Sequence, residues 1–237
     1  MTIERVAGGA CTPPFPVHPR LVETLLAGHT TAGDQRDPTV AHVLATCAGY
    51  AYADTDTVAR MMTRLGLERH ACVRITRTVD AMFIFSTAYL VQSRCGRVVM
   101  LCYRGTEPGS LGNWLGDADL GPEDADPAGA EAGARIRFHA GFHRNVRATW
   151  WEVLETLTVA LRGGSIADDK ARVEHPMEAL YVTGHSLGGA MALLFAWRLS
   201  ADPARREIAD RLRAVYTFGQ PMAFVPPLSP SVEAVGR

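Results

Sequence analysis

The chain has 237 residues, of which 47% are hydrophobic and 21% are charged, and its net charge at pH 7 is −1. This length and composition fit one globular domain with a sizeable core. The net charge near zero does not indicate a basic surface that would bind nucleic acid. The sequence contains no run of about 18 apolar residues, so we predict no membrane span.

The N-terminal end predicts an arm and gives a first indication of compartment. Residues 1–38 are rich in proline, glycine and threonine and show little periodicity, so we expect an irregular arm followed by a single domain over 39–237. No charged-then-apolar signal pattern is present, which favours a cytoplasmic protein, although a secreted precursor without its leader would look similar. Five cysteines without a C-x-x-C pair favour free thiols, and we expect no metal or organic cofactor.

The first half of the domain predicts two helices followed by two strands. These four elements are residues 39–52, 57–65, 82–92 and 98–103. The second helix has a cap at Asp54 or Asp56, and Gly66 closes it. The second strand is a continuous apolar run, which is typical of a strand buried on both faces.

The second half alternates helices and strands after a long loop. In chain order we expect a loop with one short helix at 107–134, a helix at 142–161, a strand at 179–183, a helix at 189–199, a short helix from Pro203 and a strand at 214–218. Strands separated by helices predict an α/β fold with a mostly parallel sheet and flanking helices.

The motif that carries chemistry is Gly184-His185-Ser186-Leu187-Gly188, which fits the G-x-S-x-G nucleophile elbow. This motif occurs often by chance, so its context matters. Here a predicted strand leads into it and a predicted helix leaves it, as a serine on a sharp strand-to-helix turn requires. We therefore predict Ser186 as a nucleophile rather than as a serine in a structural turn.

An acyl-transfer serine also needs donors for the oxyanion. The backbone N–H of the residue after the nucleophile, Leu187, is one such donor. Thr106 is the second candidate, because it follows the buried strand and Gly105 allows a sharp turn before it. An ordinary turn at the end of a strand is the alternative interpretation of Thr106.

Several motifs together resemble the class 3 lipases, which are fungal-lipase-like α/β-hydrolases. In chain order these motifs are Arg104-Gly-Thr106, Asn113-Trp114 with Asp117, His139-Ala-Gly-Phe142, Gly184-His-Ser-Leu-Gly-Gly189 and Thr217-Phe-Gly-Gln-Pro221. The resemblance implies an α/β-hydrolase sheet and hydrolysis of acylglycerols or related lipid esters through an acyl-enzyme on Ser186. It also implies an oxyanion hole at Thr106 and Leu187. It places a lid helix at residues 110–116, for which a helix packed on the core is the alternative.

The chain departs from this family at its C-terminal end. The acid and the histidine follow the serine in this architecture, yet all eight histidines lie before Ser186. The sequence after Pro221 lacks the family's usual continuation, so we expect an incomplete domain without the last strands and without the triad's aspartate and histidine. We do not expect Asp202, Asp210 or Glu233 to replace them, and we expect His185 to be a buried supporting residue.

Two other functions stay open at this point. One is an inactive lipase-like fragment, or a lipid-binding or interaction module, that self-associates through an exposed sheet edge. The other is a different serine α/β-hydrolase, such as a thioesterase or a phospholipase, since fold alone does not decide the substrate.

Overall fold

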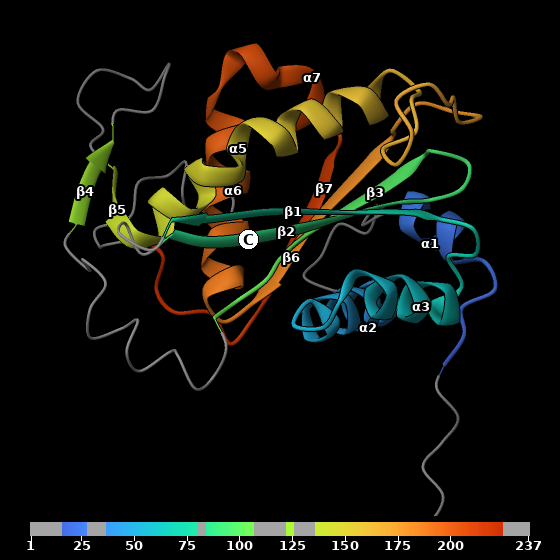
Figure 1. The fold of residues 1–237 in the computed structure, drawn as a ribbon, viewed down its shortest axis with the longest axis horizontal. Coiled ribbons are helices and arrows are strands. Elements are labelled where there is room, and N and C mark those ends of the chain that lie inside the picture. The colour runs from blue at the N-terminus through green and yellow to red at the C-terminus, as the bar shows by residue number, and fades with distance from the viewer. Residues whose placement is uncertain (1–15, 28–36, 80–83, 107–121, 126–135, 225–237) are drawn as a thin grey trace, which may run out of the picture.

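The computed structural model describes residues 16–27, 37–79, 84–106, 122–125 and 136–224. A five-stranded sheet with helices on both faces forms its centre (Figure 1). The strands of this sheet are, in spatial order, β1 (Ala71–Val79), β2 (Ile84–Gln92), β3 (Val98–Tyr103), β6 (Ala179–His185) and β7 (Leu212–Phe218). Two short strands, β4 (Pro122–Ala125) and β5 (Ile136–His139), form a separate antiparallel pair.

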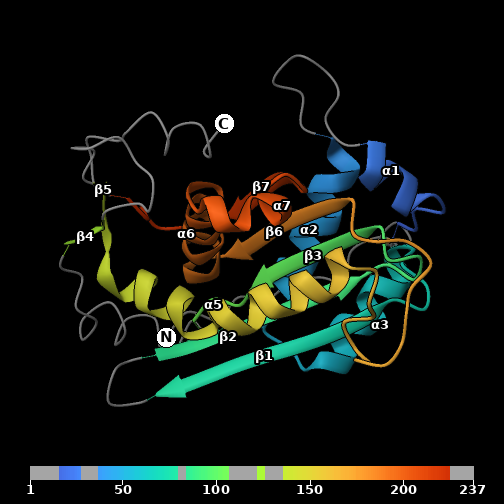
Figure 2. The ribbon, with the colours of Figure 1, turned by 90° about the horizontal axis from the view of Figure 1, so that it is seen from above.

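The helices form two layers on opposite faces of the sheet (Figures 1 and 2). One layer consists of α1 (Leu21–Ala27), α2 (Pro38–Tyr50) and α3 (Thr55–Leu65). The other consists of α5 (Ala140–Leu161) and α6 (Leu187–Ala201), followed by η2 (Pro203–Arg205) and α7 (Arg206–Ala209). Among these described helices, none is both long enough and apolar enough to cross a membrane.

The sheet is antiparallel on one side and parallel on the other. β1 pairs with β2 and β2 with β3 in antiparallel register, whereas β3, β6 and β7 run parallel. The chain passes through α5 between β3 and β6 and through α6 between β6 and β7, as parallel neighbours require a crossover. The carboxyl ends of β3, β6 and β7 therefore meet at one edge of the sheet.

β3 is buried on both faces, as its continuous apolar sequence predicts. Its alternate residues Val99, Leu101 and Tyr103 pack in the core under α5 and α6. Val98, Met100 and Cys102 pack in the core under α1, α2 and α3. This alternation follows from the period of two along a strand, and it buries β3 between the two helical layers.

The N-terminal region is more regular than its sequence predicts. α1 lies within residues 1–38, for which the composition predicts only irregular structure, and it packs on the sheet. Leu21 and Leu25 are buried, and the Tyr181 hydroxyl donates to the carbonyl oxygen of Leu25 at 2.7 Å. At seven residues α1 is too short to be stable alone. Its helical form depends on this packing, which the local sequence does not reveal.

Three further elements, β1, β4 and β5, have no counterpart among the predicted ones. β1 is an edge strand whose second half is largely exposed, so its mixture of arginine and threonine carries no clear apolar pattern. β4 lies in the segment predicted as a loop with a short helix. Its strand form comes from pairing with β5, in which Pro122 faces His139. Such a pairing depends on a distant segment and not on the four residues of β4 themselves.

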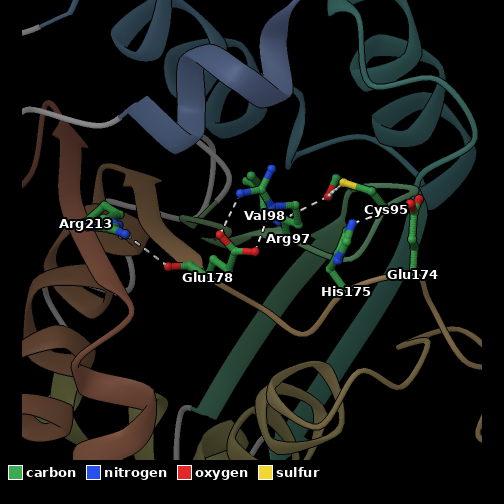
Figure 3. A network of polar contacts seen from close by, with 8 residues as sticks. Cys95, Arg97, Val98, Glu174, His175, Glu178 and Arg213 are labelled. Carbon is green, nitrogen blue, oxygen red and sulfur yellow. Dashed lines mark hydrogen bonds and ion pairs between the residues drawn. The ribbon is translucent and has the colours of Figure 1, made fainter.

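A polar network closes the amino-terminal edge of the parallel strands (Figure 3). The Arg97 guanidinium donates to both carboxylate oxygens of Glu178, at 2.7 and 2.8 Å. The backbone N–H groups of Glu178 and Ala179 donate to the Arg97 carbonyl oxygen, and Arg213 donates to the Glu178 carbonyl oxygen. The ion pair lowers the pKa of Glu178 below its usual range. This network ties together the starts of β3, β6 and β7 at the edge opposite the serine turn.

Candidate active site

Ser186 occupies the turn between β6 and α6 and has an unusual backbone conformation. Its φ is 54° and its ψ is −128°. Among the described non-glycine residues only Arg69 shares a positive φ. Such a conformation costs about 1–3 kcal/mol and persists only where the surroundings hold it. The turn predicted from the motif is present, and Ser186 is half-buried at its apex.

Hydrogen bonds fix the backbone of this turn, and Gly184 allows the close approach of segments that the turn needs. The Ser186 N–H donates to the Phe218 carbonyl oxygen at the end of β7, at 2.9 Å, and the Ser186 carbonyl oxygen accepts from Gly189 at 2.9 Å and Ala190 at 3.3 Å. A Cβ atom on Gly184 would overlap the carbonyl oxygen of Gly188. The first motif glycine therefore lets the end of the strand and the start of the helix approach each other closely.

The loop that follows β3 lies against the same turn. Tyr103, the last residue of β3, is in parallel register with Gly184 of β6. A Cβ atom on Gly188 would overlap the Tyr103 carbonyl oxygen, and one on Gly105 would approach the His185 carbonyl oxygen at 2.6 Å. Thr106 follows this contact directly. The structure thus brings Ser186, Leu187 and the 104–106 loop to one edge of the sheet.

Leu187 is the first residue of α6. Backbone N–H groups in the first turn of a helix have no acceptor within the helix, and the helix dipole favours negative charge there. Among the described residues, the Leu187 N–H has no hydrogen-bond acceptor. The turn therefore presents one oriented N–H donor directly after the serine.

His185 differs from our expectation of a buried support. The residue is exposed and is the last residue of β6. Its Nδ1 lies 2.9 Å from the hydroxyl oxygen of Tyr52, and the two rings meet edge to face with centroids 5.8 Å apart. Burial raises the pKa of Tyr52, although the nearby Arg104 opposes that shift.

Tyr52 is a residue of this site that the sequence analysis missed. It follows the end of α2, more than 130 positions before the serine motif, and belongs to none of the quoted motifs. No local signal distinguishes it from its exposed neighbour Tyr50. Only the packing of α2 against the sheet brings its hydroxyl to the turn.

Asp202 and Asp210 have structural roles, and the histidines His139 and His143 lie at the start of α5. Asp202 accepts from Ala204 N–H at the start of η2, and Asp210 accepts from Arg206 at 2.8 Å. His139 is the residue before α5. His143 packs its ring on Phe138. Among the described residues, no histidine or carboxylate hydrogen-bonds to the Ser186 side chain.

Some predicted features lie outside the described residues. These are Glu233 and the lid segment at 110–116. Within the part of the chain that is described, no group of three or more histidine, cysteine or acidic residues is arranged to hold a metal ion. The four cysteines described there are free thiols.

Comparison with known proteins identifies the family. The model of the family "Lipase (class 3)" matches residues 100–234. A triacylglycerol lipase, OBL1, of Ricinus communis is 30% identical over 172 residues, which are 60% of this chain and 31% of that protein. A lipase of Rhizomucor miehei is 25% identical over 166 residues, or 69% of this chain and 40% of that protein. The chain therefore spans well under half the length of these relatives.

Solved structures of fungal lipases share the fold. The Rhizomucor miehei lipase in its propeptide complex superposes with a TM-score of 0.61 at 21% identity, covering 87% of this chain and 60% of that one. Lipase II of Rhizopus niveus gives a TM-score of 0.58 at 21% identity, with 83% and 67% covered. The predicted α/β-hydrolase fold is confirmed.

Proposed function

The chain belongs to the class 3 lipase family, and we propose that it hydrolyses carboxylic esters of lipids through an acyl-enzyme on Ser186. Acylglycerols are the substrate class that we propose, since the relatives include triacylglycerol lipases. The observation that carries the proposal is the backbone of Ser186, which is held at positive φ between β6 and α6. A strained serine on this turn is the arrangement that exposes Oγ at the top of the sheet in α/β-hydrolases.

The proposed reaction begins with attack of Ser186 Oγ on the ester carbonyl carbon. The Oγ proton passes to a general base, a role for which no described histidine or carboxylate is hydrogen-bonded to Oγ. The carbonyl oxygen becomes an oxyanion, and the alcohol leaves with that proton when the C–O bond breaks. Water then attacks the acyl-enzyme and releases the fatty acid. The Leu187 N–H at the start of α6, and Thr106 on the loop packed beside it, are the proposed oxyanion donors. Each donor of this type contributes about 3–4 kcal/mol to lowering the barrier.

A second candidate function is a lipid-binding module of the same fold without turnover. It is favoured by one observation, namely that no described histidine or carboxylate hydrogen-bonds to the Ser186 side chain. A base must lie within hydrogen-bond reach of Oγ to activate it. When a member of such a triad is missing, only about 10³–10⁴-fold acceleration over water remains. The two candidates therefore differ in turnover and not in fold.

Ester hydrolysis by matched variants tests the proposal. We expect the parent chain to release p-nitrophenol from p-nitrophenyl butyrate and palmitate, and Ser186→Ala to fall to the rate of the buffer. Ser200→Ala is the control, because Ser200 is exposed at the end of α6, away from the turn, and it should keep the parent rate.

The outcomes separate the candidates. Equal rates for the parent and Ser186→Ala would contradict the acyl-enzyme on Ser186. Binding of triolein emulsion by both proteins without any Ser186-dependent hydrolysis would favour the module. A preference for thioesters or phospholipids over acylglycerols would keep Ser186 as the nucleophile and change the substrate class.

A further inference from the structure

Tyr52 reaches both halves of the proposed site from a third element of the fold. Its hydroxyl lies 2.9 Å from His185 Nδ1, directly before Ser186. A Cβ atom on Gly105 would overlap the same hydroxyl, so the oxygen also rests against the loop that carries Thr106.

The direction of the Tyr52–His185 hydrogen bond follows from the chemistry of the two groups. A phenol is a more acidic donor than a neutral imidazole N–H, and an unprotonated imidazole nitrogen is a better acceptor than a phenol oxygen. Burial raises the pKa of Tyr52, so the hydroxyl keeps its proton at neutral pH. When the Tyr52 O–H donates in this contact, Nδ1 of His185 is the acceptor and the imidazole proton is on Nε2.

Arg104 completes the contact from the loop side. Its guanidinium carbon lies 6.0 Å from the centroid of the Tyr52 ring, a distance at the outer limit of a cation–π contact. The tyrosine ring thus contacts the loop through Arg104 and Gly105, and it contacts the serine turn through His185. A displacement of the ring would change the spacing of these two segments, which together supply the proposed oxyanion donors.

We propose that Tyr52 is a positioning residue of the Ser186 site, which fixes His185 as its Nε2–H tautomer and holds the 104–106 loop against the serine turn. The inference rests on the proposed function, because the spacing matters only if the two segments bind an oxyanion. Tyr52 takes no part in bond making. It sets the geometry of the groups that do.

The test compares Tyr52→Phe with Tyr181→Phe. Each variant removes one hydroxyl that makes one hydrogen bond, but the Tyr181 hydroxyl bonds to Leu25 in the core below α1, away from the serine turn. We expect Tyr52→Phe to lower kcat for p-nitrophenyl butyrate by about three- to tenfold with little change in KM, the range that one hydrogen bond corresponds to. Tyr181→Phe should lower the melting temperature and leave kcat unchanged. A kcat that Tyr52→Phe leaves at the parent value would overturn the positioning role.

Nitrogen-15 NMR of the histidine side chains gives a readout that does not depend on turnover. We expect the His185 signal, assigned by its loss in His185→Asn, to show Nε2 protonated in the parent and a mixture of tautomers in Tyr52→Phe. A parent with Nδ1 protonated would overturn the proposed orientation. An inert parent that shows the Nε2–H form would contradict the proposed function and still support the Tyr52–His185 pairing.

Discussion

The backbone conformation of Ser186 is strained, and hydrogen bonds from the surrounding segments hold it in place. Its N–H is held by the end of β7 and its carbonyl oxygen by the first turn of α6. Glycine at position 184 lets these segments meet. Strain of this kind is characteristic of functional positions. At the scale of a single residue, this conformation is the strongest evidence for a nucleophile.

His70 is a second residue whose chemistry has a measurable consequence. Its Nδ1 lies 2.7 Å from the Leu67 carbonyl oxygen, whereas its Nε2 is buried without a partner among the described residues. Burial lowers the pKa of His70, although the hydrogen bond to Leu67 opposes this. The folded protein therefore resists protonation of this ring, while the unfolded chain takes up a proton at its ordinary pKa of about 6.5.

We expect this difference to make stability depend on pH. As the pH falls below about 6.5, the unfolded state binds a proton that the folded state does not, so the free energy of unfolding falls. In His70→Asn, which keeps a donor and cannot titrate, the fall between pH 8 and pH 5.5 should be smaller. Urea unfolding followed by circular dichroism measures both proteins. The same pH dependence in each would contradict the resistance of the half-buried His70 ring to protonation.

At the scale of elements, β6, the serine turn and α6 act as one unit packed on the end of β3. Gly188 is the contact point, because a Cβ atom there would overlap the Tyr103 carbonyl oxygen. We expect Gly188→Ala to push α6 from β3, to lower the free energy of unfolding by about 1–3 kcal/mol and to reduce ester hydrolysis.

Gly49→Ala is the matched control for this substitution. Gly49 lies in α2 and is exposed, and a Cβ atom added there would meet no other atom within 4 Å. Since alanine favours a helix over glycine, this variant should be stabilised, by up to about 1 kcal/mol. Thermal unfolding of both variants measures the contrast. A loss of stability at Gly49 equal to that at Gly188 would contradict the close packing argument.

The elements that the sequence predicts are those with strong local patterns. β3, the core of α5 and the strand–turn–helix around Ser186 carry continuous or periodic apolar residues, and all three are observed. Asp54, one of two alternatives, is the observed cap of α3. The sequence does not predict α1, β1, β4 or β5, because each depends on distant partners that stabilise a weak local preference.

At the scale of the whole molecule, the two ends of the parallel strands differ in what they carry. The amino-terminal edge is tied by the Arg97–Glu178 network. The carboxyl edge carries the strained turn, the exposed His185 and the 104–106 loop. Ligands of open α/β sheets bind at the carboxyl ends of their strands. The position of Ser186 therefore agrees with the architecture as well as with its own backbone.

The sequence predicts those residues of the site that directly follow the carboxyl end of a strand. Ser186 and Leu187 follow β6, and Thr106 follows β3, so the parallel register alone brings them to one edge. Tyr52 and the exposure of His185 could not be predicted in this way. Both depend on how α2 packs on the sheet. No sequence motif or spacing predicts that packing or the contact between Tyr52 and His185 that results from it.

The central claim is that Ser186 is an activated nucleophile, and intact-mass labelling with a fluorophosphonate tests it most directly. The account predicts one adduct per folded parent chain and none on Ser186→Ala, with circular dichroism showing that both are folded. A folded parent that acquires no adduct, under conditions that label a known serine esterase, would contradict the claim.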